Sequence, residues 1–133
     1  MDNCFFCKLR EGKVAGKAKE PNKYILENDL ALGRFDDFPV NPGHFEVISK
    51  RHVPTIFDTT NEEKLAIFDL INEAKKLIDK KYKPDGYNIG INSGESAGQT
   101  VMHLHVHLIP RYKGDVENPR GGIRGIIPEK QNY

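Results

Sequence analysis

Three of the five histidines in this chain alternate with apolar residues in one stretch, residues 99–110. Strict alternation is typical of a strand with one buried face, because successive side chains of a strand point to opposite sides. We therefore expect a strand at residues 99–110. Its buried face would carry Leu104, Val106 and Leu108. Its other face would carry His103, His105 and His107.

The spacing of the three histidines limits what they can do together. Neighbouring side chains on one face of a strand lie about 6.6 Å apart, and the outer two of three lie about 13 Å apart. A single metal ion with bonds of about 2.1 Å cannot easily collect three imidazoles over that length. A tri-histidine metal enzyme is therefore disfavoured, and we expect the three imidazoles to have different roles.

Composition narrows the class of protein. A length of 133 residues suits a single domain with one core, which we place at residues 1–133. The 20 basic residues are balanced by 19 acidic ones, so no basic field is available to bind nucleic acid or an anionic membrane. The first residues do not resemble a secretory signal, and no stretch is long enough to span a bilayer. We expect a cytoplasmic protein without a nucleic-acid or membrane partner.

Two cysteines near the start, Cys4 and Cys7, have the C-x-x-C spacing that lets two thiols bind one tetrahedral ion. In a reducing compartment such a pair is more typical of a metal or redox site than of a structural disulfide. A thioredoxin-like redox site needs a strand before the motif, for which there is no room. On the pair alone, half of a zinc site and two buried cysteines packed beside Phe5 and Phe6 are equally good interpretations.

The remaining pattern predicts an α+β fold. Short apolar segments bounded by turn residues predict strands at residues 24–27, 30–35, 44–49 and 87–92. A capping segment at residues 59–63 is followed by apolar residues at steps of three and four, which predicts a helix that ends before Pro84. The helix face expected to pack on the sheet carries Leu65, Phe68, Ile71, Ala74, Ile78 and Tyr82.

A loop of small residues, 93–99, leads directly into the histidine stretch. Successive glycines let backbone N–H groups converge on an anion, and Ser93, Ser96, Gln99 and Thr100 add neutral donors. The loop lacks the lysine of a Walker motif, and alone it would more often be a hairpin turn. Its position beside three histidines favours a phosphate site, and this also argues against a purely structural histidine row.

Two segments flank this core. Residues 8–22 have the composition of a solvated connector that closes at Pro21-Asn22. The C-terminal segment, residues 111–133, is rich in Gly and Pro, which is common in loose termini, but its three isoleucines also suit docking near an active site. We carry Arg111 and Arg124 as candidate phosphate contacts.

These motifs together resemble the histidine triad (HIT) superfamily of nucleotide hydrolases and transferases. The residues that carry the resemblance are Pro42-Gly43-His44, Lys50-Arg51-His52, Asn92, Gly98-Gln99-Thr100 and the stretch 103–107. The opening with Cys4 and Cys7 resembles the bacterial zinc-containing branch of the family, and residues 111–115 resemble members that hydrolyse dinucleoside polyphosphates. The resemblance implies an α+β, HIT-like fold: a five-stranded antiparallel sheet with one long helix and a short N-terminal helix, and a homodimer that joins two such sheets.

The resemblance also implies catalytic roles. His105 attacks the α-phosphate of a nucleotide and forms a nucleotidyl-histidine that water later cleaves. His107 binds the phosphoryl oxygens or helps to protonate the leaving group. His44 orients the triad. The residues expected to hold the phosphates and the bridging atom are Gln99, Thr100 and Asn92.

Two further contacts follow from the resemblance. Asp36 matches the position that holds the ribose; from the residues alone, either aspartate of the pair 36–37 could bind ribose hydroxyls or merely cap a turn. A closed tetrahedral zinc site would be formed by Cys4, Cys7, His52 and His103. Four protein ligands leave no open coordination position, so this zinc would be structural, pinning residues 1–22 beside the histidine strand. We expect no catalytic metal.

The leading function is hydrolysis of dinucleoside polyphosphates such as diadenosine tetraphosphate. The triad alone does not separate this activity from hydrolysis of nucleoside phosphoramidates, because the same intermediate serves both leaving groups. A nucleotidyltransferase or phosphorylase would differ only in the acceptor that enters at the second step. An inactive nucleotide-binding module is the least favoured alternative, because the middle histidine and its donors are all present.

Overall fold

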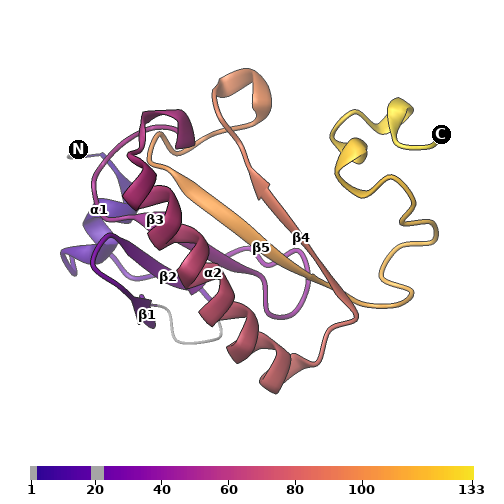
Figure 1. The fold of residues 1–133 in the computed structure, drawn as a ribbon, viewed down its shortest axis with the longest axis horizontal. Coiled ribbons are helices and arrows are strands. Elements are labelled where there is room, and N and C mark those ends of the chain that lie inside the picture. Colours follow the sequence, from indigo (N-terminus) through magenta and orange to yellow (C-terminus); the bar gives the residue numbers. More distant parts are fainter. Residues whose placement is uncertain (1–2, 19–22) are drawn as a thin grey trace.

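The computed structural model describes residues 3–18 and 23–133 and folds them around one antiparallel sheet (Figure 1). The strand order is β1-β2-β3-β5-β4. The strands are β1 (Leu26–Glu27), β2 (Ala31–Phe35), β3 (Phe45–Ser49), β4 (Gly86–Ile91) and β5 (His105–Arg111). The α-helices are α1 (Phe5–Arg10) and α2 (Asn61–Tyr82), and short 3-10 turns lie at Ile56–Asp58, Glu95–Ala97, Gly122–Ile126 and Pro128–Lys130. The expected α+β architecture is confirmed.

Cross-strand pairing gives the sheet two different faces. On the face covered by α2, Phe45 pairs with Phe35 and Leu108, and these residues form the core with the helix (Figure 1). On the opposite face, pairs between neighbouring strands form two rows. One row runs Leu32, Ile48, His105, and the other runs Arg34, Glu46, His107. Since β5 lies between β3 and β4, its histidines sit inside the sheet rather than at an edge.

The histidine strand is shorter than the expected 99–110. It begins only at His105, because the backbone bends at residues 101–103 and the N–H of Leu104 donates to the carbonyl of Val53 over 2.8 Å. The prediction that all three histidines lie on one strand face is therefore wrong for His103, which precedes the strand. The apolar partners Leu104, Val106 and Leu108 are buried as expected.

The long helix begins and ends as predicted, and Ile71, Ala74 and Ile78 are buried as expected, but the rest of its buried face differs from the prediction. Thr60 and Glu63 form a capping box, and the left-handed residue Lys83 ends the helix before Pro84. Leu65 and Phe68, expected to be buried, are 65% and 43% exposed. The buried face carries Ile67, Leu70, Ile71, Ala74 and Ile78. Apolar residues precede Ile71 at both three and four positions, so periodicity alone does not choose between the two stripes.

The C-terminal end of the chain lies apart from this core arrangement. The C-terminal segment runs beyond the β4 edge of the sheet (Figure 1). The guanidinium groups of Arg120 and Arg124 lie over the ring of Tyr133. The expected turn at Pro21-Asn22 lies outside the described residues. No helix in the described ranges has the length and apolar character needed to cross a bilayer. The cytoplasmic location stays a prediction.

Candidate active site and metal centre

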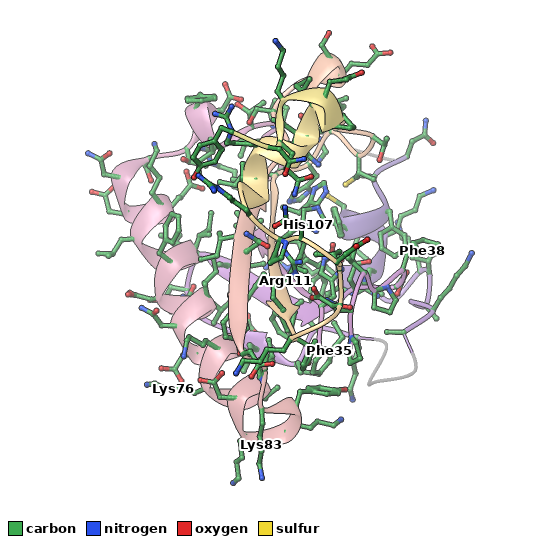
Figure 2. The ribbon with its side chains drawn as sticks, turned by 90° about the vertical axis from the view of Figure 1, so that its right-hand side faces the viewer. Phe35, Phe38, Lys76, Lys83, His107 and Arg111 are labelled. Atoms are coloured by element: carbon green, nitrogen blue, oxygen red, sulfur yellow. The ribbon has the colours of Figure 1, made fainter. Side chains whose placement is uncertain are left out.

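A cavity of about 270 Å³ opens on the sheet face opposite α2. Five of the predicted site residues line it, namely Asp36, Asn92, Thr100, His105 and His107. In Figure 2, His107 lies near the centre of the molecule, whereas Phe38, which also lines the cavity, lies near its periphery. The structure thus collects around one space the residue that follows β2, the residue that follows β4, two residues of β5 and one from the loop before β5.

The imidazole of His105 is held in one tautomer. Its Nδ1 atom lies 2.9 Å from the carbonyl oxygen of His103. A carbonyl can only accept a hydrogen bond, so Nδ1 of His105 carries the proton and donates it. In the neutral ring, Nε2 is then left with a free lone pair. His105 also packs against the ring of Phe6, with centroids 5.0 Å apart.

A second chain of contacts fixes His107. The backbone N–H of Val40 donates to Nδ1 of His44 over 3.0 Å, so the proton of neutral His44 is on Nε2. That Nε2 lies 3.0 Å from Nδ1 of His107, which therefore accepts. The remaining proton of neutral His107 is on Nε2. Unlike His105, His107 thus has a hydrogen-bond donor as its free ring nitrogen.

The surroundings keep both of these histidines neutral. Burial, followed by the neighbouring His105 and His44, lowers the pKa of His107 to about 4. Burial also lowers the pKa of His44, against the opposing effect of Asp36. The Asp36 carboxylate lies 3.5 Å from Nε2 of His44 and 3.7 Å from Nδ1 of His107. The phosphate-binding end of the cavity therefore offers the neutral ring of His107 as a hydrogen-bond donor.

The loop before β5 is built around Gln99. Its side chain was expected to contact phosphate in the cavity, but it points into the loop instead. Its Oε1 accepts the N–H of Gly94 over 2.8 Å, and its Nε2 donates to the carbonyls of Pro54 and Val101. Gln99 is buried and does not line the cavity, so its amide closes the loop, whereas the neighbouring Thr100 lines the cavity. Gly94 and Gly98 both have positive φ, which lets the loop turn this tightly.

Sequence reasoning missed a buried charged cluster in the cavity wall. Nη1 of Arg34 donates to Glu46 Oε2 over 2.7 Å, and Nη2 of Arg34 donates to Asp37 Oδ1. Burial, with the nearby Asp36 carboxylate, raises the pKa of Glu46 to about 8, although Arg34 lowers it. The signal, charged residues inside apolar strands, was present in the sequence. Only the strand register shows that these charges meet.

The four predicted metal ligands come together beside α1. Nδ1 of His103 lies 3.3 Å from Cys4 Sγ and 3.5 Å from Cys7 Sγ, and Nδ1 of His52 lies 3.4 Å from Cys7 Sγ. The two Nδ1 atoms are 3.1 Å apart, and all four ligand atoms lie within 4.8 Å of one another. Tetrahedral zinc with bonds of about 2.0–2.3 Å implies ligand separations of roughly 3.3–3.8 Å. These residues therefore form a candidate zinc site.

The donor chemistry of this cluster also suits zinc. Nε2 of His103 donates to the carbonyl of Ser49 over 2.7 Å, which leaves Nδ1 with its lone pair toward the cysteines. Burial and the neighbouring Cys4 raise the pKa of the Cys7 thiol to about 11. A divalent cation would stabilise the thiolate form that this environment otherwise disfavours.

The two candidate arginines do not reach the cavity. Arg111 is the last residue of β5, and its guanidinium donates to Asp115 and to Asn88. Arg124 lies over Tyr133. Neither residue lines the cavity that holds His105, so the structure gives no support to either as a phosphate contact.

Comparison with known proteins identifies a family that matches most of the chain. The family model of the HIT domain matches residues 17–114. Protein hit of Bacillus subtilis is 36% identical over 115 residues, which are 86% of this chain and 75% of that protein. A bis(5′-adenosyl)-triphosphatase of Dictyostelium discoideum is 41% identical over 97 residues, which are 73% of this chain and 65% of that protein. Adenylylsulfatase HINT3 of Arabidopsis thaliana is 32% identical over 115 residues, covering 86% and 55%.

Solved structures show the same fold. A HIT family protein from Bacillus anthracis superposes with a TM-score of 0.75 at 37% identity, covering 86% of this chain and 77% of that one. A zinc-bound histidine triad family protein from Mycobacterium smegmatis superposes with a TM-score of 0.75 at 31% identity, covering 88% and 81%.

Proposed function

Because this chain belongs to the HIT family of nucleotide hydrolases and transferases, we propose that it hydrolyses dinucleoside polyphosphates at the α-phosphate through a covalent intermediate on His105. One observation carries the proposal: the hydrogen bond from His105 Nδ1 to the carbonyl of His103. In the neutral ring it leaves the lone pair on Nε2, at the cavity. Such a nitrogen can attack phosphorus without a separate base.

In the first step, Nε2 of His105 forms a bond to the α-phosphorus, and the bond from phosphorus to the bridging oxygen breaks. The leaving nucleotide departs with that oxygen and its electron pair. His107 donates its Nε2–H to a phosphoryl oxygen or to the bridging oxygen. A ring with a pKa of about 4 is neutral before substrate binds, so His107 serves first as a hydrogen-bond donor and not as a charged acid.

In the second step, water attacks phosphorus and the bond from phosphorus to His105 breaks. The proton of the water passes to a phosphate oxygen or to bulk water, and the nucleoside monophosphate leaves while Nε2 of His105 recovers its lone pair. Asn92 and Thr100 line the cavity and are placed to hold the phosphate oxygens in both steps. Gln99 acts through the loop that positions Thr100, and Asp36 binds the ribose hydroxyls.

The choice of substrate is supported by the relatives. One relative is named bis(5′-adenosyl)-triphosphatase, and another is named adenylylsulfatase. Both names describe an adenylyl phosphorus that carries a different leaving group. Nucleoside phosphoramidates, or an acceptor other than water, are therefore the second candidates, since the same nucleotidyl-His105 serves each of them.

The test compares the parent protein with His105→Ala on diadenosine tetraphosphate, diadenosine triphosphate and an adenosine phosphoramidate. We expect the parent to cleave the polyphosphates faster and the variant to lose at least about 10³-fold in turnover. In His107→Asn we expect a nucleotidyl adduct on His105 by mass spectrometry. Turnover that survives in His105→Ala would refute the nucleophile assignment. The exposed α2 variant Lys76→Gln is the matched control.

We further propose that zinc is bound by Cys4, Cys7, His52 and His103 and is structural. The four side chains would complete the coordination shell, so zinc would position the segment around α1 and would not contact substrate. A zinc-bound relative with the same fold supports this assignment. The chemistry that zinc supplies here is charge neutralisation of the two thiolates.

A homodimer is the final part of the proposal. The outer edge of β4 is unpaired in the described chain, and an exposed edge strand favours pairing with a second copy. Leu65 and Phe68 in the N-terminal half of α2, and Phe57 in the turn before it, are exposed apolar residues of the kind that a second copy could cover. Analytical ultracentrifugation should show a dimer, and Phe68→Asp should shift it toward monomer. A monomer at all concentrations would contradict the proposal.

A further inference from the structure

A hydrogen-bond network at the end of β5 joins two parts of the chain that are far apart in sequence. Asp115 follows β5, and its side chain is 11% exposed. Its carboxylate accepts from Nε of Arg111 over 2.8 Å, from Nη2 of Arg111 over 2.9 Å and from the N–H of Tyr112 over 3.0 Å. It also accepts from Nδ2 of Asn41 over 2.8 Å, across 74 positions of sequence. None of these four residues lines the cavity that holds His105.

The carboxylate of Asp115 is a strong anchor for Asn41. Hydrogen bonds from Arg111, followed by those from Tyr112 and Asn41, hold the pKa of Asp115 below its ordinary value, so the group is ionised. An ionised carboxylate has about four acceptor sites, and Asp115 receives four hydrogen bonds. Hydrogen bonds to an ionised acceptor are shorter and stronger than neutral ones.

Two further hydrogen bonds tie the loop between β2 and β3 to the same end of β5. Nδ2 of Asn41 also donates to the carbonyl of Pro110 over 3.0 Å, and the hydroxyl of Tyr112 donates to the carbonyl of Pro42 over 2.7 Å. Residues 38–40 and Pro42 are exposed, so this part of the loop buries little apolar surface of its own. Its position therefore depends on these polar contacts.

The position of the loop matters because its backbone contacts His44. The carbonyl of Asn41 accepts from the N–H of His44 over 3.1 Å. The N–H of Val40, the residue before Asn41, donates to Nδ1 of His44 over 3.0 Å. A displacement of Asn41 would therefore move both of these backbone groups away from His44.

The hydrogen bond between His44 and His107 can be made in either direction. In one direction Nε2 of His44 donates to Nδ1 of His107, and the proton of His107 is on its own Nε2. In the other direction Nδ1 of His107 donates, and its Nε2 has only a lone pair. The Asp36 carboxylate lies 3.5 Å from one nitrogen of this bond and 3.7 Å from the other, so it does not choose strongly between them. The N–H of Val40 selects the first direction, because it needs the lone pair on Nδ1 of His44.

We propose that Asn41 and Asp115 are positioning residues for the candidate active site. They hold the backbone of Val40 against His44, and Val40 in turn keeps the proton of His107 on Nε2. Loss of either residue would change the protonation pattern of the cavity while leaving its lining residues in place. The inference rests on the proposed function only for its effect on turnover, because the tautomer of His107 is a property of the free protein.

The test reads the tautomer of His107 directly. The full chain, as purified, is labelled with ¹⁵N at histidine, and long-range ¹H–¹⁵N correlation spectra at pH 7 show which ring nitrogen carries the proton. We expect the parent to have His107 protonated on Nε2. Asn41→Leu keeps the approximate size of the side chain and removes both of its donated hydrogen bonds, so a second form of His107 with the proton on Nδ1 should appear.

Asp115→Ala tests the other end of the network. It removes the acceptor of Asn41 and leaves the guanidinium of Arg111, which is 25% exposed, to be hydrated by water. The second form of His107 should appear here too. The net effect of one hydrogen bond corresponds to a factor of about 3 to 10 in an equilibrium. In both variants kcat on diadenosine tetraphosphate should therefore fall by about that factor, with KM changed by less than about twofold.

Two tyrosine variants form a matched pair of controls. Tyr112→Phe removes the hydroxyl that donates to Pro42 in the loop, whereas Tyr87→Phe removes a hydroxyl that donates to Asp79 on α2. Tyr87→Phe should leave the tautomer of His107 and kcat unchanged. Tyr112→Phe should show the second form in a smaller amount, and it decides the test if neither Asn41→Leu nor Asp115→Ala folds.

Three results would overturn the inference. The first is a parent protein with His107 protonated on Nδ1. The second is an unchanged tautomer in the folded variants of the network, or the same change in Tyr87→Phe. The third is a changed tautomer without a fall in kcat in a protein that cleaves the substrate.

The tautomer and the turnover separate the two proposals. If the network variants change the tautomer of His107 but the parent cleaves no dinucleoside polyphosphate, the proposed function fails and the control of the tautomer stands. If the parent cleaves the substrate and the tautomer stays unchanged in the variants, the positioning role fails and the proposed function stands.

Discussion

Nε2 of His44 lies 3.0 Å from Nδ1 of His107, and the backbone N–H of Val40 sets the direction of this hydrogen bond by occupying the other nitrogen of His44. In neutral His107 the proton is therefore on Nε2, the nitrogen that faces the cavity, which makes Nε2 a hydrogen-bond donor. Through this pair of imidazoles, the backbone of the loop that contains Val40 sets the protonation of a nitrogen in the cavity.

Loss of the donor from His44 should reduce turnover without removing substrate binding. We expect His44→Leu to lower kcat by about 10²-fold, because His107 would no longer be held as the Nε2–H tautomer. His44→Gln can still donate to Nδ1 of His107 and should retain more activity. Steady-state kinetics on both variants measures this. Equal activity of the two would show that His44 only fills space.

The pKa of His107 predicts how stability changes with pH. Its value of about 4 in the folded protein lies below the ordinary value of 6.5, so the fold favours the neutral ring. This contribution to the free energy of unfolding is complete above pH 6.5 and is lost as the pH falls through 4. It amounts to at most about 3 kcal/mol.

The measurement is urea unfolding between pH 7 and pH 4 for the parent and for His107→Asn. The variant should lose less stability over this range than the parent. Both proteins keep the zinc ligands, so the difference between the two curves isolates His107. Parallel curves would show that the ring is not held neutral by the fold.

Zinc removal should act on the stability of the fold and should not act directly on the catalytic step. Elemental analysis of protein purified without chelator should find about one zinc per chain. A strong chelator should expose the thiols of Cys4 and Cys7 to a thiol reagent and lower the melting temperature, and Cys7→Ser should do the same. Metal-free protein that is fully folded and active would contradict the structural assignment.

The corrected face of α2 predicts contrasting effects for two neighbouring apolar residues. Ile67 is fully buried, so Ile67→Ala should lower the free energy of unfolding by about 2–5 kcal/mol. Leu65 is 65% exposed, and Leu65→Ala should change the stability of a single subunit by less than about 0.5 kcal/mol. Chemical denaturation measures both, and a larger effect at Leu65 would show that the stripe was assigned to the wrong residues.

Local pattern was enough to predict three of the strands, the caps of the helix and the Cys4/Cys7 half of the metal centre, whereas His52 and His103 were named as ligands from the family resemblance. Alternation and turn residues are properties of neighbouring positions, and C-x-x-C spacing brings two ligands together without any tertiary information. For this reason β2, β3 and β4 lie within one residue of the expected ranges.

Features that depend on contacts between distant parts of the chain could not be predicted from the pattern of neighbouring residues. The meeting of Arg34 with Glu46 requires the alignment of β2 with β3. The start of β5 at His105 depends on a hydrogen bond between Leu104 and Val53. The inward position of Gln99 depends on the carbonyl of Pro54, far away in the chain. In each case the deciding partner is more than ten residues distant.

His103 serves two sites with two different parts of itself. Its imidazole faces the cysteines, while its carbonyl holds the proton of His105. Every residue has a backbone carbonyl, but the carbonyl of residue 103 is held in one place because the imidazole of His103 is anchored beside the cysteines. The residue types that evolution can tolerate at position 103 are therefore restricted by the reaction at His105, although the side chain of residue 103 takes no part in that reaction. A substitution at position 103 would leave His105 itself unchanged, yet it would displace the carbonyl that fixes the tautomer of His105.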